Sequence, residues 1–118
     1  CYAQARGYDY WLLDIRSWPE CAKYGLWGAS MFFQKHCAVR ALLELQEPGY
    51  VAIVIDTDVV PATLDRGIED WLQIDSDVHV YERMAGPEIA AGNYIVRNTP
   101  WALQFLHEWC EYAFKIPK

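Results

Sequence analysis

The sequence predicts an α/β domain in which a mostly parallel sheet is flanked by helices. Segments with the composition of strands alternate along the chain with segments whose apolar residues recur every three or four positions. Residues 51–55 form an unbroken, largely β-branched apolar run, which is typical of a strand covered on both faces. With 118 residues, 53% of them hydrophobic, the chain is long enough for one domain with its own core.

The first quarter of the chain predicts a short helix, a strand and a loop. Residues 1–6 are expected to be the last turns of a helix that Gly7 closes. Residues 8–15 are aromatic and apolar, which predicts a strand. Residues 16–29 combine proline and glycine with large aromatic rings, so they predict either a packed surface loop or a flap that faces a ligand.

The rest of the chain predicts three helices and three strands. Ser30 is a candidate N-cap for the first of these helices, and Thr99 and Pro100 suit the N-cap and first helical position of the last. Besides residues 51–55, strands are expected at 78–81 and 92–96. The helices are expected at residues 30–46, 61–72 and 99–113.

Two aspartates, Asp56 and Asp58, directly follow the apolar run. Ligands bind at the carboxyl ends of strands in open α/β sheets, and side chains two positions apart on a strand point the same way. Two carboxylates held close together repel each other, and a divalent cation relieves that repulsion. Mg²⁺ and Mn²⁺ prefer oxygen ligands and share them with substrate phosphates. The placement therefore predicts a metal site, with surface acids at a strand end as the alternative.

A second Asp-x-Asp pattern, Asp75-Ser76-Asp77, comes before an apolar stretch instead of after one. It is therefore interpreted as a solvated turn. The position of the first pair at a strand end is the signal for a metal, more than the spacing of the two aspartates.

Composition limits the possible classes of function. A net charge of -6 with no basic run argues against a general nucleic-acid-binding protein, because phosphate backbones need a clustered basic surface. No apolar segment reaches the length of a membrane span. Six Trp and eight Tyr are a high aromatic content, which suits a core and also a cleft that receives sugar or nucleoside faces.

The four cysteines, Cys1, Cys21, Cys37 and Cys110, are widely spaced, so a structural zinc site is not expected. They permit two disulfides in an oxidising compartment. Cys37 and Cys110 fall on apolar helical faces, which also suits buried thiols. The chain begins with neither Met nor a signal peptide, so it is interpreted as a segment of a longer protein.

Four segments resemble, in their order, a known group of enzymes. They are Gly7-Tyr8-Asp9, residues 35–41, Ile55-Asp56-Thr57-Asp58 and residues 91–101. Together they resemble the GT-A glycosyltransferases grouped with fungal α-galactosyltransferases and plant xyloglucan xylosyltransferases. The chain is still more similar to uncharacterised nucleotide-diphospho-sugar-transferase-like proteins of nematodes. The resemblance spans nearly all 118 residues.

The resemblance implies a Rossmann-like GT-A fold that binds a nucleotide sugar. It implies retaining transfer of a hexose or pentose from a nucleotide-diphosphate sugar to a hydroxyl of a glycan or protein acceptor. It also implies dependence on Mn²⁺ or Mg²⁺ and a Golgi or secretory lumen, with any membrane anchor outside this segment.

By the same resemblance, Asp56 and Asp58 would hold the metal against the donor diphosphate. For Lys35 the alternative is a solvated position on a helix, for Arg40 a structural ion pair, and for Glu88 a solvated loop acid. The implied donor-binding residues are Lys35, Arg40, Thr57, Glu88, Ala91, Gly92 and Asn93.

Parts of the family pattern are missing. Ala90 stands where relatives often have Asn. The expected first strand, which holds the base, would precede Cys1, and the acceptor-side residues with a metal-binding His would follow Lys118. The chain is therefore expected to be an incomplete GT-A domain, and no catalytic base or nucleophile can be assigned.

Two other functions fit parts of the sequence. Residues 55–60 also fit the opening motif of haloacid-dehalogenase-type phosphatases, with Asp56 as nucleophile and Asp58 as acid–base. That chemistry needs a later lysine, and only Lys115 and Lys118 follow. The other is a non-catalytic descendant of the GT-A fold that binds a nucleotide sugar or a protein partner without turnover.

Overall fold

A computed structural model of the chain describes residues 1–25, 31–84 and 86–115. Its internal contacts divide it into two units. The sheet unit consists of Cys1–Leu12 and Val51–Val96, and the helix unit consists of Leu13–Tyr50 and Arg97–Lys118. Helices and strands both occur, so the predicted α/β class is confirmed.

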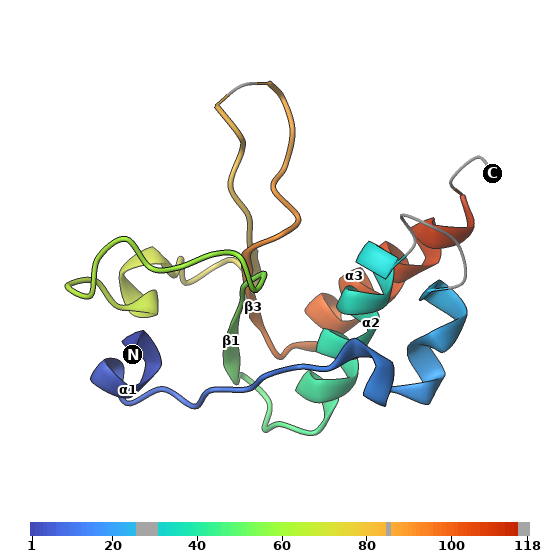
Figure 1. The fold of residues 1–118 in the computed structure, drawn as a ribbon, viewed down its shortest axis with the longest axis horizontal. Coiled ribbons are helices and arrows are strands. Elements are labelled where there is room, and N and C mark those ends of the chain that lie inside the picture. Colours follow the sequence, from blue (N-terminus) through green and yellow to red (C-terminus); the bar gives the residue numbers. More distant parts are fainter. Residues whose placement is uncertain (26–30, 85, 116–118) are drawn as a thin grey trace. The chain divides into compact units, whose positions relative to one another are not determined.

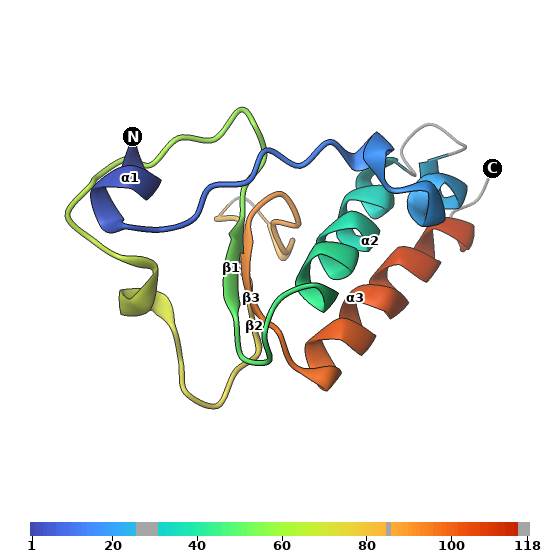
Figure 2. The same ribbon diagram turned by 90° about the horizontal axis from the view of Figure 1, so that it is seen from below.

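Three short strands form one sheet, in the order β1 (Val51–Val54), β3 (Tyr94–Arg97) and β2 (Val78–His79). Figures 1 and 2 show β1 and β3 side by side. β2 is antiparallel to β3, with Val78 opposite Val96. β1 is antiparallel to β3 as well, because Tyr50 is bonded to Asn98 at one end and Asp56 to Asn93 at the other.

The prediction of a mostly parallel sheet is therefore wrong for the strands that the structure describes. The expectation that residues 51–55 are covered on both faces is also wrong, since none of these five residues is buried. Ile53 and Ile55 are each 40% exposed. An apolar run reports that a segment is apolar, but it specifies neither the direction of the neighbouring strand nor the number of neighbours.

Helix α1 (Tyr2–Arg6) ends as predicted at Gly7, whose φ of 70° is left-handed. The strand predicted at residues 8–15 is absent; this segment is unpaired and runs into a 3-10 turn. The helix predicted at 61–72 is reduced to the 3-10 helix η4 (Ile68–Trp71). The spacing of apolar residues did not suffice to predict the structure of residues 61–72, because side-chain hydrogen bonds hold this segment to the N-terminal segment.

Those hydrogen bonds come from three residues near the N-terminus. The Tyr2 hydroxyl donates to the carbonyl of Arg66, and the Arg6 guanidinium donates to the carbonyl of Leu64. The Tyr8 hydroxyl donates to the Glu69 carboxylate and accepts from the Ile68 N–H. The Tyr8 hydrogen bond lowers the pKa of the Glu69 carboxyl.

The helix unit is built on α2 (Met31–Glu44) and α3 (Pro100–Glu111), which lie side by side in Figures 1 and 2. Both helices were predicted within a few residues, and the cap is confirmed: the Thr99 side chain accepts from the Ala102 N–H. The proposed Ser30 cap lies outside the described residues. The residues buried by the two helices include Ala38, Val39, Leu43, Ala102, Leu106 and Cys110.

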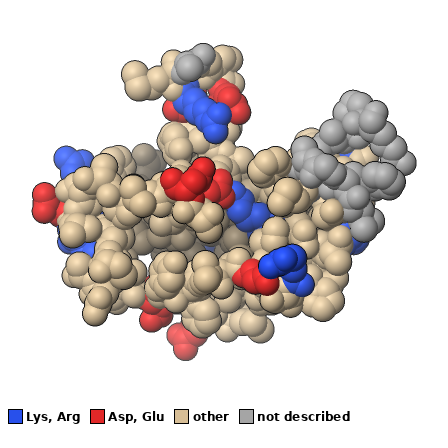
Figure 3. Space-filling view, in the orientation of Figure 1, with Lys and Arg blue, Asp and Glu red and all other residues tan. Residues whose placement is uncertain are grey.

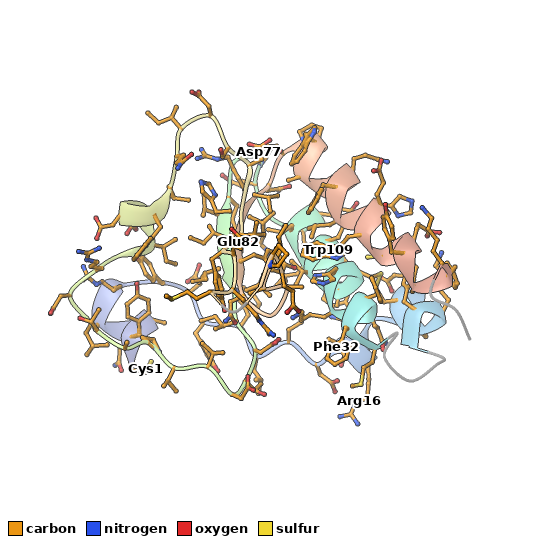
Figure 4. The ribbon with its side chains drawn as sticks, turned by 90° about the horizontal axis from the view of Figure 1, so that it is seen from above. Cys1, Arg16, Phe32, Asp77, Glu82 and Trp109 are labelled. Carbon is orange, nitrogen blue, oxygen red and sulfur yellow. A yellow bond between two sulfur atoms is a disulfide. The ribbon has the colours of Figure 1, made fainter. Side chains whose placement is uncertain are left out.

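A stacked ring pair joins the two helices. His36 of α2 is only 2% exposed, and its ring lies 3.9 Å from the Trp109 ring of α3 with 12° between the planes. Figure 4 labels Trp109 on α3. Burial, and secondarily the charge of Lys35, lowers the pKa of His36 to about 3, so this imidazole is neutral at physiological pH.

Asn98 fixes the C-terminal end of α2. Its side-chain amide donates to the carbonyls of Leu43, Gln46 and Glu47 at 2.9–3.0 Å. These bonds satisfy carbonyls that the end of a helix leaves without an intrahelical partner. Gly49 follows with a φ of 85°, as expected for a turn that glycine permits.

Two short 3-10 helices, η1 (Ile15–Ser17) and η2 (Pro19–Gly25), occupy most of the region predicted to be a loop, and residues 26–29 of that loop lie outside the described residues. A disulfide joins Cys21 of η2 to Cys37 of α2. Cys110 is instead a buried thiol that donates to the Leu106 carbonyl, and burial raises its pKa to about 12. No described helix is long and apolar enough to cross a membrane.

Candidate metal and donor site

The two aspartates predicted to bind metal lie in a turn. β1 ends at Val54, and the Val59 N–H then donates to the Asp56 carbonyl at 3.0 Å. Asp56 is half-buried, whereas Thr57 and Asp58 are exposed. The strand alternation used to align the two carboxylates does not apply, because both lie beyond the strand. The turn leaves Asp58 accessible to a ligand.

A bulge in the β2–β3 hairpin faces this turn. His79 pairs with Ile95, and Glu82 pairs with Ile89. Two residues separate His79 from Glu82, but five separate Ile89 from Ile95, so one arm carries three extra residues. Bulges of this kind bend a strand and re-aim its side chains, and they are common beside functional sites. Here the extra length falls within residues 90–94.

Gly92 in the bulge lies directly against Asp56. A Cβ added to Gly92 would lie 2.6 Å from Asp56 Oδ2, closer than real Cβ contacts come. A side chain at position 92 would therefore shift the Asp56 carboxylate from the position seen in the structure. The resemblance implied that Gly92 binds the donor, whereas the contact seen in the structure is with Asp56.

Asn93 connects three parts of the site. Its Oδ1 accepts from the Asp56 N–H at 3.1 Å, and its Nδ2 donates to the Tyr81 hydroxyl at 3.3 Å. Both ends of the amide are thus used within the protein. Asn93 holds the Asp56 turn against the hairpin, which is a positioning role.

The structure brings together Asp56, Gly92 and Asn93, which the sequence nominated, and adds Tyr81, which it did not. A signal for Tyr81 was present. It lies at the end of one predicted strand, and Asn93 lies at the start of the strand that follows the Gly86-Pro87 turn. Antiparallel pairing of a hairpin would place these two residues opposite each other.

Three predicted donor-binding residues have other surroundings. Lys35 and Arg40 belong to the helix unit. The Arg40 guanidinium makes an ion pair with Glu44 one turn along α2, with Nη2 2.8 Å from Oε1, which is the structural alternative expected for it. Glu88 is an exposed loop residue whose carboxylate lies 3.6 Å from the Arg83 guanidinium.

The oxygen ligands of the Asp56 turn suit Mg²⁺ or Mn²⁺. No group of three or more His, Cys, Asp or Glu side chains that could hold a metal occurs in the described part of the chain. A site built on Asp56 and Asp58 would therefore complete its coordination with water and substrate phosphates, as such ions commonly do. On the face shown in Figure 3, charges of both signs are interspersed and most of the described surface carries neither. A charged ligand on that face would meet no broad field of one sign.

Comparison with known proteins assigns the chain to a family. The family described as "Protein of unknown function, DUF273" matches residues 1–118. The chain belongs to DUF273. No curated protein matches it, and no solved structure does. For this DUF273 chain, function has to be argued from the site itself.

Proposed function

We propose that this DUF273 chain carries the donor-binding core of a metal-dependent, GT-A-type glycosyltransferase. The proposed reaction moves a hexose or pentose, with retention, from a nucleotide-diphosphate sugar to a hydroxyl of a glycan or protein. One observation carries the proposal. The Asp56 carboxylate, just beyond the end of β1, lies against Gly92, where an added side chain would displace it, and the exposed Asp58 carboxylate follows two positions on.

The local contacts explain why such a turn suits a metal. The hydrogen bond from Asp56 N–H to Asn93 and the bond from Val59 N–H to the Asp56 carbonyl hold the turn backbone from two sides. The energy needed to order the turn is thus supplied by folding, before any ligand arrives. Asp56 and Asp58 would hold Mn²⁺ or Mg²⁺, which when bound neutralises the diphosphate leaving group.

The small side chains beside the turn suit a bulky donor. Ala91 is half-buried and projects little beyond the backbone, and Thr57 is exposed between the two aspartates. A diphosphate and its sugar would approach over these residues. For Arg40 the ion pair with Glu44 is a structural role, and donor binding by Lys35 and Arg40 stays a prediction.

The disulfide supports the proposed compartment. Cys21 and Cys37 are bonded to each other. Structural disulfides persist in oxidising compartments and are rare in the cytosol. A Golgi or secretory lumen is therefore part of the proposal.

Calorimetry with Mn²⁺ and a panel of nucleotide sugars tests the proposal. The unmodified chain is expected to bind at least one nucleotide sugar only when Mn²⁺ is present. Asp58→Ala should abolish that binding, because it removes one of two charged ligands of the metal. Asp75→Ala is the matched control: Asp75 is an exposed aspartate of the other Asp-x-Asp pattern, and its loss should change nothing.

Three outcomes separate the alternatives. Equal affinity of the Asp58→Ala and unmodified proteins would remove Asp58 from the site and contradict the proposal. A trapped phosphoaspartate at Asp56, without nucleotide-sugar binding, would identify a phosphatase. Metal-dependent binding without transfer or hydrolysis would support the donor site and assign the chain to non-catalytic binding.

A further inference from the structure

The Tyr81 hydroxyl is hydrogen-bonded to Asn93, the residue that holds the proposed metal turn. Tyr81 follows β2, and its backbone is fixed because its carbonyl accepts from the Ala90 N–H at 2.9 Å. Its side chain is 52% exposed. The hydroxyl accepts from Asn93 Nδ2 and has no acceptor for its own proton among the residues that the structure describes.

The orientation of this hydrogen bond follows from the backbone. The Asp56 N–H can only donate, so the atom of Asn93 that faces it must be the amide oxygen. The Asn93 NH₂ group then faces Tyr81, and the hydroxyl must accept from it. The Tyr81 proton is therefore directed away from Asn93 and can be given to another group.

The hydroxyl also lies within reach of a metal-bound ligand. A single amide group separates it from the Asp56 backbone nitrogen, so the two atoms are at most about 9 Å apart. An ion held by the Asp56 carboxylate would lie about 2 Å from its oxygen, with further oxygen ligands on its far side.

We propose that Tyr81 donates its hydroxyl proton to a non-bridging oxygen of the donor diphosphate, and that Asn93 is the residue that positions it. This inference rests on the proposed donor site and assigns to it a further ligand-binding residue. The Tyr81 hydroxyl accepts from Asn93 and keeps its proton to donate, so a ligand atom that takes this proton must be an acceptor. A phosphate oxygen is the strongest acceptor that a nucleotide sugar offers, since hydrogen bonds to charged groups are shorter and stronger than neutral ones.

Calorimetry of Tyr81→Phe tests this inference. With Mn²⁺ present, the affinity for a nucleoside diphosphate is expected to fall about tenfold, as for loss of one hydrogen bond to a charged group. The affinity for a nucleotide sugar should fall by the same factor, because the lost contact is to the shared phosphates. Binding of Mn²⁺ alone should be unchanged. Tyr10→Phe is the control, since Tyr10 lies in the same unit and is 74% exposed.

A double-mutant cycle tests the role of Asn93. If Asn93 positions the hydroxyl, Tyr81→Phe should have little effect on nucleoside-diphosphate binding in an Asn93→Ala protein. A loss that appears only with the nucleotide sugar, or equal affinities of Tyr81→Phe and the unmodified chain, would overturn the inference and leave the donor site standing. Failure of the unmodified chain to bind Mn²⁺ with a nucleoside diphosphate would overturn both.

Discussion

Different interactions stabilise the interior of each of the two units. In the helix unit, apolar side chains from α2 and α3 are almost completely buried, and a disulfide adds a covalent link. Among the described residues, the sheet unit buries fewer apolar residues, and hydrogen bonds from Tyr and Arg side chains join its N-terminal segment to residues 64–68. Its buried apolar residues are Ala90, Tyr94, Ile95 and Val96.

The proposed site lies entirely in the sheet unit. There, the position of Asp56 depends on the absence of a side chain at Gly92 and on one amide, Asn93. Stability and ligand binding should therefore respond to different substitutions. Changes in the helix unit should alter the free energy of unfolding, and small changes around the Asp56 turn should alter binding.

The largest effect is expected from truncating the helix core. Leu106 is 0% exposed, and Leu106→Ala should lower the free energy of unfolding by about 2–5 kcal/mol through lost burial and the cavity left behind. Leu64→Ala makes the same change at a side chain of the sheet unit that is 55% exposed. Leu64→Ala should lower the free energy of unfolding by less than about 1 kcal/mol. Denaturant unfolding measures both, and equal losses would contradict the contrast between the units.

A pH effect of intermediate size should come from His36. Below pH 6.5 the unfolded chain takes up a proton on this imidazole, whereas the folded chain does not until about pH 3. The stability linked to His36 is therefore complete above pH 6.5 and is lost as the pH falls. The free energy of unfolding should drop by about 2 kcal/mol between pH 7 and pH 5. Most carboxylates titrate below pH 5, so they contribute little to the change between pH 7 and pH 5.

The comparison protein is His36→Leu, which has no proton to take up at this position. Its unfolding free energy should depend less on pH over the same interval, by about the amount that His36 contributes. Parallel curves for the two proteins would show that His36 is protonated equally in the folded and unfolded states.

Gly92→Ala is expected to have the smallest effect on the free energy of unfolding. It should nevertheless weaken the binding of Mn²⁺ and a nucleoside diphosphate. The new methyl group would displace the Asp56 carboxylate, and affinity for Mn²⁺ with a nucleoside diphosphate should fall about tenfold, or about 1.4 kcal/mol. Gly86→Ala is the control, because no atom lies within 4 Å of the added Cβ. If both variants bind like the unmodified chain, Asp56 does not need its observed position.

Much of the helix unit could be predicted from the sequence. Apolar spacing located α2 and α3, and Thr99-Pro100 located the start of α3, because these signals are local. The direction and edge position of β1 could not be predicted, since pairing depends on residues distant in sequence. The η4 region was missed because Tyr8, about 60 residues away, holds it with side-chain hydrogen bonds.

The candidate site was predicted in part. Asp56 was nominated by its position after the apolar run, and Gly92 and Asn93 were nominated by resemblance; the structure gives each a contact within one cluster. The turn that contains Asp58 and the bulge at residues 90–94 were not foreseen, because no spacing rule for regular strands describes either feature. The contact of Tyr81 with Asn93 was overlooked, although regular hairpin pairing points to it.

The most direct test of the central claim is the paramagnetic effect of Mn²⁺ on the backbone amide signals of the chain, measured by nuclear magnetic resonance with a nucleoside diphosphate present. The account predicts selective broadening of the signals of Asp56, Asp58 and Gly92, and the same titration with Asp58→Ala should leave them sharp. Broadening centred on other residues, such as Asp75 and Asp77, or no selective broadening at all, would contradict the claim that the turn after β1 is a metal site.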